Sequence, residues 1–136
     1  MTDPPRKRPV AFIDASAIVA LVDANDRSHA AAVATYQDLL AQGYRLFTID
    51  FVIAEAFDLL RVGVGSETAR AWLRDHRLPI YRADEADLEQ AKRLLLDERA
   101  PAERSFADAV SFAVMDRLGV ADAFAVDRHF LADAPG

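Results

Sequence analysis

The chain has 136 residues, 52% of them hydrophobic, and its 22 acidic and 16 basic side chains give a formal net charge of −6. This length suits one domain with a substantial core, and this hydrophobic content excludes global disorder. The lack of cysteine excludes a disulfide framework and a thiolate metal site, and the apolar runs are too short to cross a bilayer. The negative charge argues against a broad electrostatic contact with nucleic acid, unless carboxylates are gathered to hold divalent cations. A soluble cytoplasmic protein fits these features best.

The N-terminal residues 1–9 contain three prolines and three basic residues, which predict a flexible tail. The apolar run that follows, Val10–Ile13, is too short for a secretory signal and leads into a carboxylate, Asp14. Four apolar residues in succession are typical of a strand that is buried on both faces of a parallel sheet. Residues 10–136 are therefore expected to form a single domain that begins with such a strand.

Strands and helices are expected to alternate along this domain. Further strands are expected at Arg45–Ile49, Leu78–Tyr81 and Ala123–Val126. Helices are expected at Ser16–Leu21, Ser28–Gln42, Phe51–Val62, Ser66–His76, Asp84–Asp97 and Ser105–Leu118, with a closing turn at Arg128–Ala132. Gly43 and Gly119 stand where a glycine commonly ends a helix. This order predicts an α/β fold of three layers (α/β/α), in which a central parallel sheet of about four to five strands has helices on both faces.

Two acidic residues directly follow apolar strands. Right-handed crossovers place the carboxyl ends of parallel strands along one edge of the sheet, so Asp14 and Asp127 are both expected there. Open α/β sheets bind their ligands at this edge. Asp14 or Ser16 could instead only cap the next helix. Asp116 and Asp122 are alternatives to Asp127, although they also fit a solvated helix end and a polar turn.

A third acid, Glu55, lies on a helix face that is otherwise apolar. Its neighbours on that face are Phe51, Val52, Leu59 and Val62. An unpaired charge in such surroundings would cost several kcal/mol, so a compensating group is expected. A metal ion, Arg61 or Arg104 could supply the opposite charge. Asp58 is a less suitable candidate, because Arg61 three residues later offers it an ordinary partner on the helix surface.

A fourth acid, Asp108, lies in the first turn of its expected helix. Ser105 and Asp108 have nearly the spacing of a capping box, and an acidic residue suits this end of a helix. Capping is therefore the simpler role for Asp108 considered alone. The two roles can coexist, because a helix that begins at the sheet edge directs this carboxylate towards Asp14.

The four acids together indicate a site for a hard divalent cation. Without cysteine, and with His29, His76 and His129 lacking ligand spacing, oxygen donors favour Mg²⁺ or Mn²⁺. Such a site can activate water, polarise a phosphate and neutralise charge at the leaving oxygen. Hydrolysis of a phosphodiester is the reaction that most needs this chemistry.

Three segments of the chain carry a resemblance to a known family. They are Phe12–Ser16, Ile53–Leu60 and Ser105–Met115, the last running on to Phe124–Phe130. In this order and separation, they resemble a PIN domain, and specifically a VapC-type toxin of bacterial toxin–antitoxin pairs. The resemblance extends from Val10 to Phe130.

The resemblance implies both a site and partners. The catalytic and metal-binding acids would be Asp14, Glu55, Asp108 and Asp127, surrounded by the hydroxyl groups of Ser16 and Ser111. The implied reaction is cleavage of single-stranded or structured RNA by metal-activated water. The implied assembly is a homodimer together with a VapB-type antitoxin, which in several such pairs inserts an arginine into the acidic cluster.

Two positions depart from the family pattern. Ala125 stands where many relatives carry Thr or Ser, and Asp50 is expected in a loop where Thr or Ser is common. Both substitutions are expected to tune the site rather than abolish it. Four arginines could line an approach path for RNA, although a scattered solvated surface is the simpler interpretation for most of them: Arg61, Arg104, Arg117 and Arg128.

The sequence is also compatible with two other functions. The chain could be a catalytically silent PIN-fold partner that acts through complex formation with a DNA-binding antitoxin. It could also be a receiver-like domain that accepts a phosphoryl group at Asp14. That fold usually needs a lysine near the last strand, whereas the only lysine beyond the N-terminal tail, Lys92, lies on an expected helix.

Overall fold

The computed structural model describes residues 8–126. Most of the expected tail 1–9, Asp127 and the expected turn at Arg128–Ala132 lie outside the described residues. In chain order the described elements are β1 (Val10–Ile13), α1 (Ala15–Val22), α2 (His29–Ala41), β2 (Arg45–Ile49), α3 (Asp50–Gly63), α4 (Ser66–Asp75), β3 (Ile80–Tyr81), α5 (Glu85–Leu96), α6 (Phe106–Leu118) and β4 (Ala123–Phe124). Within residues 8–126, none of the helices is long and apolar enough to span a membrane.

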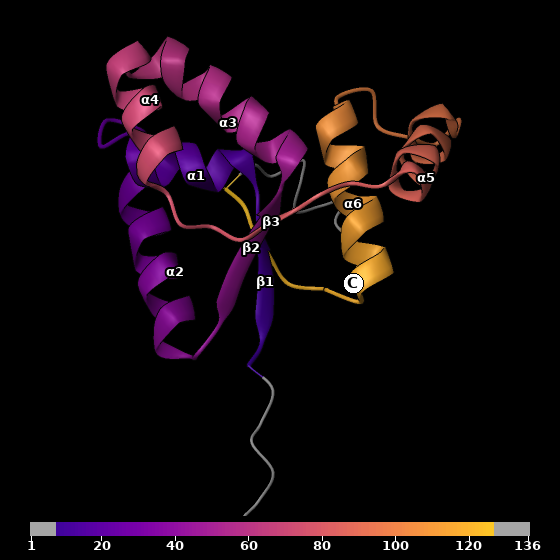
Figure 1. The fold of residues 1–136 in the computed structure, drawn as a ribbon, viewed down its shortest axis with the longest axis horizontal. Coiled ribbons are helices and arrows are strands. Elements are labelled where there is room, and N and C mark those ends of the chain that lie inside the picture. The colour runs from indigo at the N-terminus through magenta and orange to yellow at the C-terminus, as the bar shows by residue number, and fades with distance from the viewer. Residues whose placement is uncertain (1–7, 127–136) are drawn as a thin grey trace, which may run out of the picture.

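The strands form one parallel sheet in the order β3-β2-β1-β4. The register pairs Val10 with Arg45 and Phe12 with Ala123, so β1 is a central strand. Helices α1 and α2 lie on one side of the sheet, and α5 and α6 lie on the other (Figure 1). The predicted three-layer α/β/α architecture with a parallel sheet is therefore confirmed.

The core is built around the two strands that were predicted with their observed bounds, β1 and β2. Phe12 is fully buried, and its ring meets that of Phe47 edge-on, with 5.7 Å between the centroids. Between the same strands, the hydroxyl of buried Thr48 donates to the carbonyl of Ile13 at 2.8 Å. Burial of a hydroxyl is costly unless it is hydrogen-bonded, and this bond also fixes the end of β1, one residue before Asp14.

The outer strands are shorter than expected, for identifiable reasons. Pro79 has no N–H to donate, and the N–H of Leu78 donates to Nδ1 of His76 at 3.2 Å, so β3 begins only at Ile80. At the other edge, the N–H of Val126 donates to a side chain rather than to a strand, and β4 ends at Phe124. At Leu78 and at Val126, a hydrogen bond to a side chain thus replaces the hydrogen bond that a longer strand would make within the sheet.

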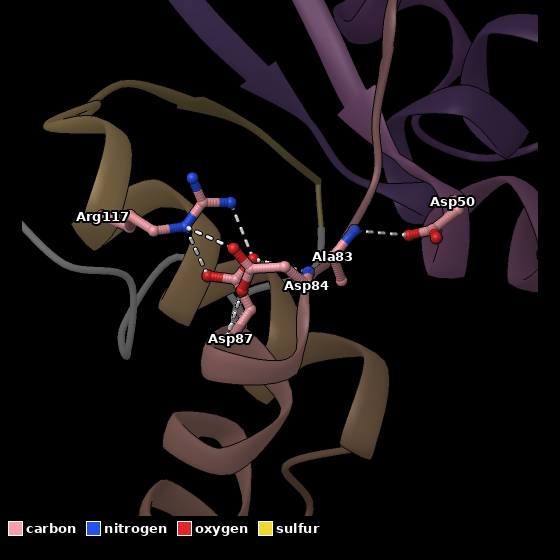
Figure 2. A network of polar contacts seen from close by, with 5 residues as sticks. All are labelled: Asp50, Ala83, Asp84, Asp87 and Arg117. Carbon is pink, nitrogen blue, oxygen red and sulfur yellow. Dashed lines mark hydrogen bonds and ion pairs between the residues drawn. The ribbon is translucent and has the colours of Figure 1, made fainter.

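Asp50 corrects one expectation, because it does not lie in a loop but is the first residue of α3. Its Oδ1 accepts a hydrogen bond from the N–H of Phe51 at 3.1 Å. It also accepts one from the N–H of Ala83 at 3.3 Å, which Figure 2 shows. A carboxylate is stabilised in the first turn of a helix by the unpaired N–H groups there. Asp50 therefore ties the start of α3 to the segment that follows β3.

An ion pair joins α5 to α6. Nε and Nη2 of Arg117 each donate to a carboxylate oxygen of Asp87 at 2.7 Å (Figure 2). Only 2% of Asp87 is exposed. Asp84 and Asp87 form the capping box of α5, and the guanidinium of Arg117 lies 5.4 Å from the ring centroid of Tyr81. The hydrogen bonds from Arg117 hold the pKa of Asp87 below its ordinary range. Arg117, one of the arginines considered for an RNA path, therefore has a structural partner.

Candidate active site

Asp14 lies at the carboxyl end of β1 and is only 5% exposed. Its N–H donates to the carbonyl of Phe124 in β4 at 3.0 Å. As the N-cap of α1, its Oδ2 accepts from the backbone N–H of Ser16 at 3.3 Å and from the Ser16 hydroxyl at 3.0 Å. The capping role considered for Asp14 is thus confirmed. It is compatible with ligand binding, because a carboxylate offers about four acceptor positions on its two oxygens.

Ser16 connects Asp14 to the segment that leads to Asp127. Its hydroxyl donates to Asp14 and accepts a hydrogen bond from the N–H of Val126 at 3.1 Å. This bond joins residues 110 positions apart in the chain. It brings the residue before Asp127 next to the pair of Asp14 and Ser16. Asp127 itself lies outside the described residues, so its role stays a prediction.

The two alternatives to Asp127 lie elsewhere. Asp122 precedes β4, at the amino end of that strand, and its Oδ2 accepts a hydrogen bond from the hydroxyl of Tyr44 at 3.0 Å. This contact raises the pKa of Tyr44. Asp116 is exposed near the carboxyl end of α6. Neither residue lies at the carboxyl edge of the sheet.

Glu55 lies in the second turn of α3, half-buried, with its Oε2 closed off from solvent. The fully buried residues of this helix are Val52, Ala56 and Leu60. Leu59 and Val62, two of the apolar neighbours of Glu55, are exposed, so only part of this apolar face is buried. Glu55 therefore lies at the border of the buried face, where one of its oxygens is shielded.

Asp108 is the third residue of α6 and is half-buried. Its backbone N–H donates to the hydroxyl of the N-cap residue Ser105 at 3.0 Å, which is the first half of the predicted capping box. Ser111, one turn later and fully buried, donates its hydroxyl to the carbonyl of Ala107 at 2.8 Å. The predicted role of Ser111 in the hydroxyl shell around the acids stays a prediction.

The elements that carry the three described acids meet at one edge of the sheet. Figure 1 shows α1, α3 and α6 beginning near the ends of β1 and β2, and α3 packs against both of the other helices. The rings of Phe51 and Phe106 bring the first turns of α3 and α6 together, with 6.0 Å between their centroids. Phe51 lies one helical turn before Glu55, and Phe106 lies two residues before Asp108. The first turns of α3 and α6 therefore lie beside each other at this edge, and a joint metal site of the acids stays a prediction.

Comparison with known proteins agrees with this architecture, since the family model for the PIN domain matches residues 11–134. The chain belongs to the PIN-domain family. It is 32% identical over 123 residues to the 23S rRNA-specific endonuclease VapC20 of Mycobacterium tuberculosis, a match that covers 89% of this chain and 92% of that protein.

Two solved structures share this PIN fold. The crystal structure of M. tuberculosis VapC20, described as a toxin that cleaves the sarcin-ricin loop, aligns with a TM-score of 0.77 and 31% identity, covering 90% of this chain and 93% of that one. VapBC2 from Rickettsia felis, bound to a DNA fragment from the promoter of the pair, aligns with a TM-score of 0.60 over 82% of this chain and 83% of that one. At 14% identity, the second likeness supports the fold alone.

The predicted site acids carry oxygen donors, the donor type that a hard cation prefers. Within residues 8–126, no three His, Cys, Asp or Glu side chains are grouped closely enough to hold a metal ion. Asp127 does not belong to that range. The donors at the edge are carboxylate oxygens, and Asp14 and Oε2 of Glu55 are shielded from water. Such donors suit Mg²⁺ or Mn²⁺ better than softer metals.

Arg104 adds positive charge beside the helix that carries Asp108. It directly precedes the N-cap Ser105, and its guanidinium carbon lies 5.2 Å from the ring centroid of Phe112. Phe112 is one helical turn after Asp108, and Nε of Arg104 is closed off from solvent. This cation–π contact holds a permanent charge next to the acid-bearing face of α6.

Proposed function

We propose that this PIN domain is a metal-dependent endoribonuclease and the toxin of a VapBC-type toxin–antitoxin pair. The observation that carries the proposal is the placement of Asp14 at the end of central strand β1, where the helices bearing Glu55 and Asp108 also begin. The 32% identity to VapC20 across most of both chains supports the same activity.

The acids have distinct tasks in this proposal. Asp14, Glu55 and Asp108 hold Mg²⁺ or Mn²⁺, and Asp127 contributes a fourth carboxylate. The bound ion supplies activation of water and neutralisation of charge on the phosphate. Ser16 holds the Asp14 carboxylate in a fixed orientation through two hydrogen bonds. A ligand that is fixed before binding loses less conformational entropy when the site is occupied.

The substrate we propose is ribosomal RNA. VapC20 is named for its action on 23S rRNA, and its structure is described as that of a toxin cleaving the sarcin-ricin loop. The net charge of −6 repels a polyanion, so divalent cations and local arginines are needed to hold RNA at the edge. The corresponding hairpin of 23S rRNA is therefore the first substrate to test.

We also assign the chain a VapB-type antitoxin and a homodimeric state, acting in the cytoplasm. A groove of about 790 Å³ lies among α1, α2, α4 and β2, and most of its lining side chains are apolar. The charged lining residues are basic, namely Arg8, Arg45 and Arg77. In an acidic protein, this combination suits a partner segment that presents apolar and acidic side chains.

Cleavage of the sarcin-ricin hairpin RNA in the presence of Mn²⁺ tests the enzymatic proposal. Asp14→Asn or Asp108→Asn should reduce the rate by about 1,000-fold, since loss of the bound ion removes several kcal/mol of charge stabilisation. EDTA should abolish cleavage by the wild type. The matched control is Asp58→Asn, which removes an exposed carboxylate of α3 and should leave the rate unchanged.

Equal cleavage by the wild type and the Asp14→Asn/Asp108→Asn double variant, both folded by circular dichroism, would rule the proposal out. Antitoxin binding with no cleavage of any RNA, and no rise in Tm on addition of Mn²⁺, would instead favour the catalytically silent partner.

A further inference from the structure

An exposed aromatic ring lies where the two acid-bearing helices meet. Phe106 is the first residue of α6, and 42% of it is exposed, although it is a large apolar side chain. Its ring rests against Phe51 with an interplanar angle of 39°, and Phe51 in turn packs against the core. One part of the Phe106 side chain therefore packs on Phe51 while another part faces solvent.

The support places this ring beside the candidate active site. Phe51 and Glu55 are four residues apart, so they share a face of α3. Asp108 and Phe112 have the same spacing on α6, and the guanidinium of Arg104 lies over Phe112. Each acid thus has an aromatic residue one turn away, and Phe106 spans the gap between the two helices.

These groups match the chemistry of a single-stranded nucleotide. A nucleobase stacks on an aromatic ring, and a cationic side chain near the ring attracts the backbone phosphate. A single exposed apolar side chain is ordinary on a protein surface. Phe106 differs because its ring is held by a second ring, that of Phe51, which lies one helical turn before Glu55 on α3.

The geometry points to Phe106 as the stacking platform for a nucleobase next to the phosphodiester that is cut, with Phe51 as its support. This inference rests on the proposed function and adds a residue that positions the RNA. Stacking accepts any base, so Phe106 sets affinity and placement more than sequence preference.

Binding of a fluorescein-labelled sarcin-ricin hairpin RNA tests the platform. Measurements use the protein with its acids intact and replace Mn²⁺ by Ca²⁺, which also binds oxygen ligands, so that a cation is kept at the edge while cleavage is slowed. Phe106→Ala and Phe106→Leu should each weaken binding by roughly 5- to 100-fold, the range expected for loss of one stacked base. Phe106→Trp should restore affinity to within about twofold, because the indole ring also stacks. With Mn²⁺ in place of Ca²⁺, Phe106→Ala should raise KM more than it lowers kcat.

Leu73→Ala is the matched control, because Leu73 is similarly exposed at 43% but lies on α4. It should leave binding unchanged. Wild-type affinity in Phe106→Leu would overturn the inference, since only apolar bulk would then matter. So would normal RNA binding in Phe106→Ala combined with loss of self-association or of antitoxin binding, which would assign the ring to a protein interface.

The inference and the proposed function fail in different ways. If substitution of Phe106 leaves RNA binding and metal-dependent cleavage unchanged, the stacking role is excluded and the nuclease proposal stands. If RNA binding depends on Phe106 but the wild type cleaves no RNA, stacking of a base on Phe106 is supported and the nuclease proposal is excluded.

Discussion

Arg117→Met removes the cation that joins α5 to α6 while keeping an unbranched apolar stem. The change leaves the carboxylate of Asp87, only 2% exposed, without its two hydrogen bonds of 2.7 Å. Breaking a buried ion pair in this way costs about 3–5 kcal/mol. Since 34% of the Arg117 side chain is exposed, water screens part of the interaction, and we expect a loss of about 2–3 kcal/mol. For a chain of this size, Tm should fall by roughly 6–12 °C.

The loss should depend on pH in a defined direction. Arg117 lowers the pKa of Asp87 in the folded state below its ordinary value of 3.8. The stabilisation is therefore fully present above that ordinary value, and it disappears as the pH falls through the lower folded value. The deficit of Arg117→Met relative to the wild type should be largest near neutral pH and should shrink in acid.

Urea unfolding at a series of pH values from neutral down to about pH 2.5, below the ordinary pKa of the carboxyl group, measures both effects. Arg93→Met is the matched control, because Arg93 lies on α5 and donates to Gln90 at an exposed position. It should change the free energy of unfolding by no more than about 0.5 kcal/mol. In the double variant Asp87→Asn/Arg117→Met, the loss should be smaller than the sum of the single losses. An additive cycle, or equal losses in Arg93→Met and Arg117→Met, would refute the reasoning.

Two further predictions concern β2 and the groove. Thr48→Val should cost about 1–3 kcal/mol in the free energy of unfolding, because the buried carbonyl of Ile13 loses its hydroxyl partner, whereas Thr48→Ser should retain most of the stability. Chemical denaturation of both variants checks this, and equal losses would contradict it. Leu40→Glu, which places an acid at an exposed position in the groove, should weaken antitoxin binding measured by calorimetry without changing RNA cleavage. Unchanged antitoxin affinity in Leu40→Glu would exclude the groove as the contact.

The central part of the fold could be predicted because its signals are local. The segments Val10–Ile13 and Arg45–Ile49 have clear ends, and both strands have the expected bounds. The outer strand β3 is shorter, because Pro79 has no N–H to donate and the N–H of Leu78 donates to the side chain of His76 instead. The sequence pattern predicts a loop at Asp50, whereas this residue begins α3. Its second hydrogen-bond partner, the N–H of Ala83, is 33 positions away in the chain and leaves no local signal.

The site residues also divide into those that local sequence signals predict and those that depend on contacts between distant segments. The place of Asp14 follows from an apolar strand that ends at a carboxylate, and the cap at Asp108 follows from its spacing to Ser105. By contrast, contacts between helices decide which apolar residues stay exposed, as at Leu59 and Phe106, and helical periodicity does not contain that information. The Asp87 ion pair likewise depends on how α5 packs against α6.

The bond between Ser16 and Val126 has a consequence for synthesis of the protein. A ribosome releases its product in order from the N-terminus, and Val126, the donor to Ser16, emerges 110 positions after Ser16 itself, directly behind strand β4. In a nascent chain, Asp14 therefore emerges long before β4 and Val126 can pack beside it. A nuclease built in this way has an incomplete site until nearly all of its chain has been translated.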